Sequence, residues 1–117
     1  MEQRATLYIV PTPIGNLEDI TLRAVRILGE VGLVLAEDTR TTGNLMKHLG
    51  ISTKLMAHHK FNEHRSVGQV LERMQSGIDV ALVSDAGTPS ISDPGFLLVR
   101  ECIRSGFYVN CLPGPTA

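Results

Sequence analysis

Val80-Ala-Leu-Val-Ser-Asp-Ala-Gly-Thr-Pro-Ser-Ile-Ser-Asp-Pro-Gly95 decides the fold, because an apolar run breaks abruptly into a loop of small, polar and proline residues. Residues 80–83 are apolar without interruption, which is typical of a strand covered on both faces in a parallel sheet. The loop that follows is longer than the roughly two to six residues of a plain βα connection, and its small residues let backbone N–H groups approach a ligand closely. The stretch therefore predicts a buried strand that ends at a ligand, with Asp93 and Pro94 opening the next helix.

The whole chain repeats this arrangement, since five apolar runs alternate with four helical patterns. This is the rhythm of repeated βαβ units, so we predict an α/β fold with a five-stranded, mainly parallel sheet flanked by helices. The predicted strands span residues 6–10, 33–36, 54–57, 80–83 and 108–112. Three glycines that follow helical patterns are expected to adopt the positive φ of a helix end: Gly50, Gly77 and Gly106.

Apolar residues at helical spacing predict the faces that cover the sheet. The helical pattern at about 41–49 is poorer than the other three. The apolar faces of those three are expected to comprise Ile20, Ala24, Ile27, Leu28 and Val31; Val67, Val70, Leu71 and Met74; and Leu98, Val99, Cys102 and Ile103.

Composition and charge limit the possible functions. With 117 residues the chain suits one domain, and its hydrophobic fraction of 43% is ordinary for a globular protein. A formal net charge of -1 gives no long-range attraction to nucleic-acid phosphates. Cys102 and Cys111 fall in a helical and a strand pattern, so both are expected to be small core residues in a reducing compartment. No stretch approaches the roughly 18 to 20 apolar residues of a membrane span and no secretory signal begins at Met1, so we expect a cytoplasmic protein with no membrane partner.

Polar and glycine-rich clusters follow every predicted strand, at residues 11–16, 37–40, 58–64, 84–93 and 113–116. The turns that lead into the strands, such as 30–32 and 77–79, are short and chemically plain. Ligands of open parallel sheets bind outside the carboxyl ends of the strands. The sequence therefore predicts a functional site at one edge of the sheet.

The cluster after the second predicted strand holds the candidate catalytic residues Glu37, Asp38 and Arg40. Adjacent carboxylates suit proton abstraction or polar anchoring of a ligand, and an arginine can clamp a phosphate with two hydrogen bonds. An acidic pair at a helix start with a solvated arginine is the structural alternative, and the sequence leaves both open.

The cluster after the third predicted strand invites a metal interpretation, with His58, His59 and His64 as ligands and Glu63 as a fourth. A strand and loop give these residues no enforced ligand spacing, and no cysteine joins them, so we predict no metal site. We expect a histidine or Asn62 to contact a substrate instead. Nothing resembles the Gly-x-Ser-x-Gly elbow of a covalent hydrolase.

Four motifs occur in order along the chain: Tyr8-Ile-Val-Pro-Thr-Pro-Ile-Gly-Asn16, Ala36-Glu-Asp-Thr-Arg40, Leu82-Val-Ser-Asp-Ala-Gly-Thr-Pro-Ser-Ile-Ser-Asp-Pro-Gly95 and Pro113-Gly-Pro-Thr-Ala117. Together they resemble the ribosomal RNA small subunit methyltransferase I family of the tetrapyrrole methylase superfamily. The resemblance implies methyl transfer from S-adenosylmethionine to a ribose 2′-hydroxyl of a cytidine in small-subunit ribosomal RNA. It also implies that residues 1–117 are an N-terminal domain, with a second α/β domain after Ala117 and the cofactor in the cleft between them.

The same resemblance assigns site residues by motif. Thr88 stands where the superfamily usually has an aspartate, so an anchoring carboxylate there is in doubt and Asp85 is the substitute. Asn16, His59 and Asn62 extend the assignment to the substrate side, beside Glu37, Asp38 and Arg40. The implied cofactor-binding residues are Pro13, Asp85, Ala86, Gly87, Thr88, Ile91, Thr116 and Ala117.

Methyl transfer from a sulfonium is an in-line displacement, so the protein must chiefly align donor and acceptor; Glu37 or Asp38 is the candidate base for the hydroxyl proton. The implied partners are small-subunit ribosomal RNA or the 30S subunit and a second copy of the protein as a homodimer. Alone, the chain is expected to bind the cofactor weakly or not at all and to be inactive. Two alternatives remain open: a related methylase acting on a tetrapyrrole or a protein, and a receiver-like signalling domain that is not an enzyme.

Overall fold

The computed structural model describes residues 4–12, 20–59, 61–84 and 94–112. Strands and helices alternate through this part of the chain: β1 Thr6–Pro11, α1 Leu22–Glu30, β2 Leu33–Ala36, α2 Thr39–His48, β3 Leu55–Ala57, α3 Glu63–Gln75, β4 Val80–Ser84, α4 Pro94–Arg104 and β5 Tyr108–Cys111. The strands form one sheet in the order β3-β2-β4-β1-β5, and every neighbouring pair is parallel. The predicted α/β fold is confirmed, and each strand begins and ends within one residue of its predicted bounds.

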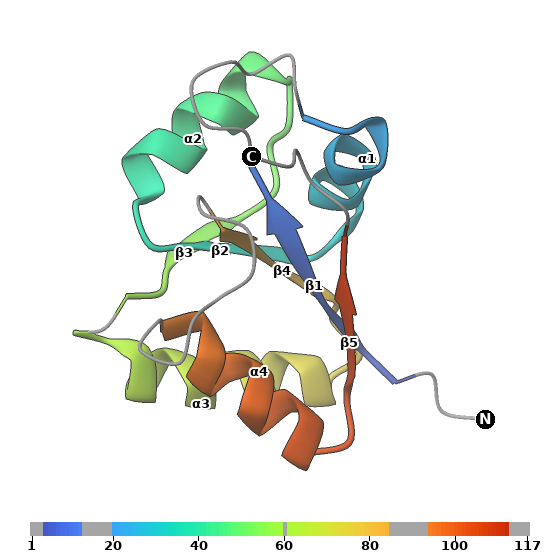
Figure 1. Ribbon diagram of the computed structural model, residues 1–117, viewed down its shortest axis with the longest axis vertical. Coiled ribbons are helices and arrows are strands. Elements are labelled where there is room, and N and C mark those ends of the chain that lie inside the picture. The colour runs from blue at the N-terminus through green and yellow to red at the C-terminus, as the bar shows by residue number, and fades with distance from the viewer. Residues whose placement is uncertain (1–3, 13–19, 60, 85–93, 113–117) are drawn as a thin grey trace.

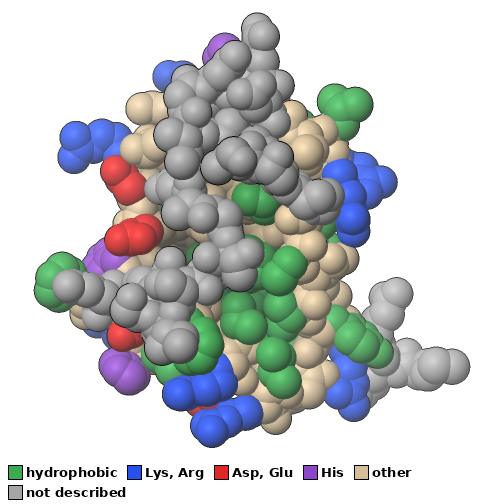
Figure 2. All heavy atoms as spheres, in the orientation of Figure 1, with side chains coloured by type: hydrophobic (Ala, Val, Ile, Leu, Met, Phe, Trp, Pro, Cys, Tyr) green, Lys and Arg blue, Asp and Glu red, His purple; other side chains and the backbone are tan. Residues whose placement is uncertain are grey.

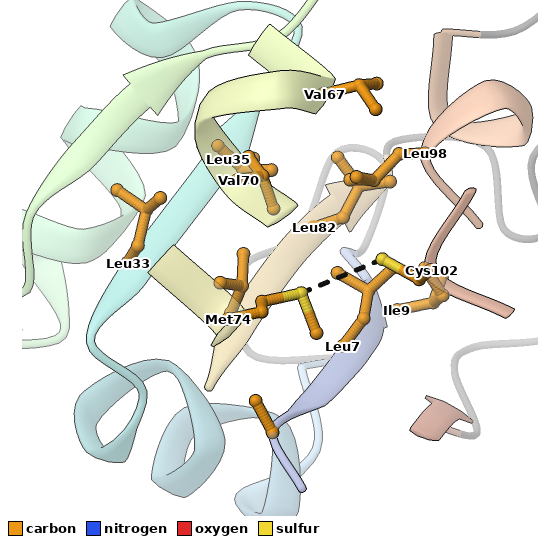
Figure 3. Close-up of a cluster of buried hydrophobic side chains, with 12 residues drawn as sticks. Leu7, Ile9, Leu33, Leu35, Val67, Val70, Met74, Leu82, Leu98 and Cys102 are labelled. Atoms are coloured by element: carbon orange, nitrogen blue, oxygen red, sulfur yellow. Dashed lines mark hydrogen bonds between the residues drawn. The ribbon is translucent and has the colours of Figure 1, made fainter. Parts of the chain in front are cut away.

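The molecule has three layers, with α1 and α2 on one face of the sheet and α3 and α4 on the other (Figure 1). Between the sheet and the second pair of helices lies a core cluster in which helix side chains point toward strand side chains (Figure 3). Met74 of α3 and Cys102 of α4 meet there, with their sulfur atoms 3.7 Å apart. Burial and the neighbouring Glu101 charge raise the pKa of the Cys102 thiol to about 12, as suits a packing residue.

The central strand β4 is apolar at four successive positions because it contributes to both core clusters. Val80 and Leu82 pack toward α3 and α4, while Ala81 and Val83 pack toward α1 and α2. All four are buried. A strand covered on both faces needs apolar residues at every position, so the uninterrupted run carries no alternation.

Two residues that the sequence predicted to be buried are exposed. Cys111 lies in β5, the edge strand of the sheet, and its side chain is exposed. Ile103 is 60% exposed, although Leu98 and Cys102 on the same helix are fully buried. Each helical residue turns about 100° from the one before, so the position after Cys102 rotates out of the core. Both predictions were wrong because the sequence pattern does not show which side of a strand or helix is left uncovered by the neighbouring elements.

The helix ends are marked by a capping side chain, which was not predicted from the sequence, and by the predicted glycines. Thr21 caps α1, and its hydroxyl accepts a hydrogen bond from the Ala24 N–H at 3.0 Å. Gly50, Gly77 and Gly106 all have the predicted positive φ, at 73°, 90° and 84°. These turns return the chain to the amino edge of the sheet, so the opposite edge is left to the loops that follow the strands.

Candidate functional site

Two neighbouring central strands, β1 and β4, are followed by helices on opposite faces of the sheet (Figure 1). β1 is followed by α1 on one face, and β4 by α4 on the other. The two strands end side by side, where Pro11 pairs with Ser84. A parallel sheet whose connections diverge in this way opens a crevice at the carboxyl ends of the two strands, which is where such folds bind ligands.

The described residues Thr12 and Ser84, at the ends of these two strands, are small and uncharged. Thr12 donates its N–H to the Ser84 carbonyl at 2.9 Å, and its hydroxyl lies 3.3 Å from the same oxygen. The pairing of β1 with β4 therefore continues one residue beyond Pro11. The segments that follow these two strands in the sequence contain most of the predicted cofactor residues. The predicted residues that lie outside the described part of the chain are Pro13, Asn16, Asp85, Ala86, Gly87, Thr88, Ile91, Thr116 and Ala117.

The turn between β2 and α2 carries the three predicted catalytic residues. Asp38 is the N-cap of α2: its Oδ1 accepts hydrogen bonds from the N–H groups of Arg40 at 2.9 Å and Thr41 at 3.3 Å. Its Oδ2 accepts from the Thr41 hydroxyl at 3.1 Å. The hydrogen bonds from Thr41 and Arg40 lower the pKa of the Asp38 carboxyl, with a smaller contribution from the Arg40 charge. Asp38 is thus an ionised helix cap, as the structural alternative for this cluster proposed.

Glu37 and Arg40 differ from Asp38, because both side chains are exposed beside this cap. In the part of the chain that the structure describes, no hydrogen bond or ion pair engages the Glu37 carboxylate. Of the two adjacent carboxylates, Glu37 is the one with both oxygens accessible to a ligand.

The loop between β3 and α3 begins beside this turn. The His58 N–H donates to the Ala36 carbonyl at 2.9 Å, which continues the β2–β3 pairing to the ends of both strands. His58 itself is buried, and its Nδ1 lies 2.8 Å from the Ser66 hydroxyl of α3. It therefore anchors α3 against the sheet and is not exposed to a substrate.

Asn62 holds the shape of this loop with both ends of its amide. Its Oδ1 accepts from the His59 N–H at 2.8 Å, and its Nδ2 donates to the Ala57 carbonyl at 3.1 Å. Phe61 donates its N–H to His59 Nδ1 at 3.2 Å. The structure gives Asn62 a positioning role inside the loop, while His59 remains half-buried at its rim.

Sequence reasoning missed these loop contacts. An asparagine just before a helical pattern signals a local bond to the backbone, which was a usable clue for Asn62. Nothing in the sequence indicates that His58 pairs with Ser66 eight residues later, because that contact depends on how α3 packs.

Neither a metal site nor a membrane span is found among the described residues. No group of three or more histidine, cysteine, aspartate or glutamate side chains in that part of the chain is placed to hold a metal ion. No helix of the described ranges is long and apolar enough to cross a membrane.

Comparison with curated proteins finds close relatives named ribosomal RNA small subunit methyltransferase I. The chain is 56% identical to the one from Escherichia coli O157:H7 and 54% identical to the one from Vibrio cholerae, over 95% of its length in each case. It is 55% identical to the one from Pseudomonas aeruginosa over 96% of its length. The chain spans only 39%, 38% and 40% of the length of these three relatives.

Solved structures share the fold. Two crystal structures of uroporphyrin-III C-methyltransferase from Thermus thermophilus match with TM-scores of 0.74 and 0.72 and sequence identities of 22% and 23%. The matches cover 97% and 96% of this chain, and 49% of the matched chain in each case. The family model of tetrapyrrole (corrin/porphyrin) methylases matches residues 6–117. The resemblance seen in the sequence motifs is confirmed, and the chain belongs to the tetrapyrrole methylase family.

Proposed function

We propose that this chain forms one wall of the active site of an S-adenosylmethionine-dependent methyltransferase that acts on a ribose 2′-hydroxyl of a cytidine in small-subunit ribosomal RNA. One observation carries the proposal most. The two segments that the motifs assign to the cofactor, one with Pro13 and one spanning residues 85–91, follow β1 and β4 in the sequence, and these two strands end side by side.

The charge around the crevice fits the proposed cofactor. S-adenosylmethionine, when bound, supplies an electrophilic methyl group on a positively charged sulfonium. Glu37 and Asp38 follow β2, which pairs with β4, so two carboxylates lie at the neighbouring strand end. Thr12 and Ser84 at the crevice are neutral. The two carboxylates favour a ligand that carries a positive charge at this strand end.

In the proposed reaction the residues of this edge align the ribose hydroxyl and remove its proton. Glu37 is the proton acceptor, since Asp38 is engaged at both oxygens and its lowered pKa makes it a poor base. Arg40, exposed on the first turn of α2, holds an RNA phosphate. Alignment at a closed site supplies the remaining rate enhancement without a covalent intermediate.

The relatives support the ribosomal substrate over the alternatives. Identities of 54–56% to ribosomal RNA methyltransferases exceed those of 22–23% to uroporphyrin methyltransferases. A receiver-like domain is no longer a candidate, because the chain belongs to a methylase family. We further propose a cytoplasmic homodimer that acts on the 30S subunit and whose cofactor cleft is completed by a second domain.

A chimaera tests this function. The chain replaces the 111 matching residues of the Escherichia coli relative, and the purified chimaera is incubated with S-adenosylmethionine and undermethylated 30S subunits. Mass spectrometry of the digested RNA should show 2′-O-methylcytidine that requires both the cofactor and the chimaera. Methylation of a base, or of no nucleotide while the unaltered relative remains active, would disprove the assignment.

A further inference from the structure

Phe61 exposes 88% of its surface on the loop after β3, although phenylalanine is normally a core residue. Figure 2 shows a hydrophobic side chain and histidine side chains at the border of the molecule where Figure 1 places this loop. An aromatic ring presented to solvent beside a candidate site is an observation that the family motifs do not address.

Hydrogen bonds link the described residues on both sides of this ring. The Asn62 amide joins the His59 N–H to the Ala57 carbonyl, and the Asn62 N–H donates to the His59 carbonyl at 3.0 Å. The Asn62 carbonyl in turn accepts from the Ser66 N–H of α3 at 2.9 Å. A ligand that contacts the ring therefore orders little additional backbone, which lowers the entropic cost of binding.

His59 lies against Phe61 edge to face, with ring centroids 6.0 Å apart and an interplanar angle of 64°. Because its Nδ1 accepts the Phe61 N–H, a neutral His59 carries its proton on Nε2. The pair thus combines an aromatic face with a hydrogen-bond donor at its rim.

The loop lies next to the proposed catalytic turn. The His58 N–H bonds to the carbonyl of Ala36, the residue before Glu37. Phe61 follows His58 by three residues, so their Cα atoms are within about 11 Å of each other. Exposed basic side chains follow the loop on the first turn of α3, at His64 and Arg65. A nucleic-acid strand along this edge would meet an aromatic ring and basic groups close to Glu37.

We propose that Phe61, with His59 beside it, is a stacking platform for an unpaired nucleobase of the substrate RNA, close to the nucleotide that is methylated. The inference rests on the proposed function, since it takes RNA as the substrate. Proteins recognise single-stranded RNA chiefly by stacking its bases on aromatic side chains, and each stack typically changes affinity about fivefold or more. A stack needs no large positive charge, which suits a chain whose net charge is -1.

The sequence contains no tryptophan, so a substituted tryptophan reports from one place. Phe61→Trp places it on the platform. Ile103→Trp is the matched control, because Ile103 is 60% exposed at the far end of α4. Each variant is titrated with polycytidylate and with heparin, a polyanion without bases. We expect polycytidylate to quench the emission of Phe61→Trp and leave Ile103→Trp unchanged, and heparin to quench neither.

Affinity variants complete the test. Phe61→Leu should raise the Kd for polycytidylate about fivefold or more, while Phe61→Tyr stays within about twofold. The exposure of Phe61 predicts unchanged thermal unfolding in all of these variants. Binding of polycytidylate without quenching of Phe61→Trp, or with equal affinity in Phe61→Leu, would overturn the platform and leave the proposed function intact. Absence of polycytidylate binding overturns the platform, whereas failure of the chimaera to methylate the 30S subunit overturns the function.

Discussion

The turn after β2 and the loop after β3 are both stabilised by a polar side chain, but the two side chains differ in charge and burial. Each is held by one side chain that bonds to nearby backbone: the Asp38 carboxylate in the turn and the Asn62 amide in the loop. Asp38 is charged and exposed, whereas Asn62 is neutral and half-buried. The Asp38 carboxylate interacts favourably with the positive end of the α2 dipole, and its charge depends on pH. The Asn62 amide carries no charge, so neither statement holds for it.

The difference also separates two tasks at the proposed site. In the turn, the cap leaves Glu37 as the accessible carboxylate, which suits acid–base chemistry. In the loop, the amide holds an exposed aromatic ring in place, which suits binding. Chemistry and recognition are thus assigned to adjacent strand ends, and each assignment predicts a different response to mutation.

The largest expected effect concerns catalysis in the turn. Glu37→Gln in the chimaera should lower kcat about a hundredfold or more at saturating substrates, because it removes the proton acceptor and keeps the shape. Asp38→Asn is the matched control: asparagine also caps helices, so kcat should stay within about threefold. Rates are measured by methyl incorporation into 30S subunits. A larger loss in Asp38→Asn would assign the base to Asp38, and equal losses in the two variants would contradict Glu37 as the single base.

A smaller effect concerns the stability of the two structures. Asn62→Ala removes both amide bonds from a half-buried position and should lower the free energy of unfolding by about 1–3 kcal/mol. Asp38→Ala should lower it less, because water replaces bonds to an exposed carboxylate. Urea unfolding followed by circular dichroism measures both. Asn44→Ala, at an exposed position of α2, controls for helix propensity. A larger decrease in the free energy of unfolding for Asp38→Ala than for Asn62→Ala would contradict this prediction.

The smallest expected effect is on the acid side of the pH profile. The pKa of Asp38 is lowered from 3.8 in the folded chain, so folding favours its ionised form. The resulting stability is fully present above pH 3.8 and is lost as pH falls through the folded pKa. The difference in unfolding free energy between wild type and Asp38→Asn should therefore be constant at neutral pH and shrink below pH 3.8. A difference that does not change across this range would show that the capping bonds do not depend on charge.

Local pattern predicted most of the fold and only the position of the site. The uninterrupted apolar run at residues 80–83 marked β4 because burial on both faces imposes it. The exposure of Cys111 was not predictable, since the strand order decides that β5 is the edge strand, and the exposure of Ile103 depends on which side of α4 faces the core. The clusters follow the carboxyl ends of the parallel strands, and a functional site at this edge stays a prediction. The roles of individual side chains depend on how the elements pack, as in the contact between His58 and Ser66 of α3, which no local pattern contains.

The central claim is that the crevice between β1 and β4 binds the cofactor. Amide NMR of the isotope-labelled chimaera, titrated with S-adenosylmethionine, measures this directly. Among the described residues, we predict the largest shift changes at Thr12 and Ser84, where the two strands end, and little change at Gly32 and Asp79 at the amino edge. The largest changes at the amino edge or along β5, with Thr12 and Ser84 unperturbed, would contradict the account.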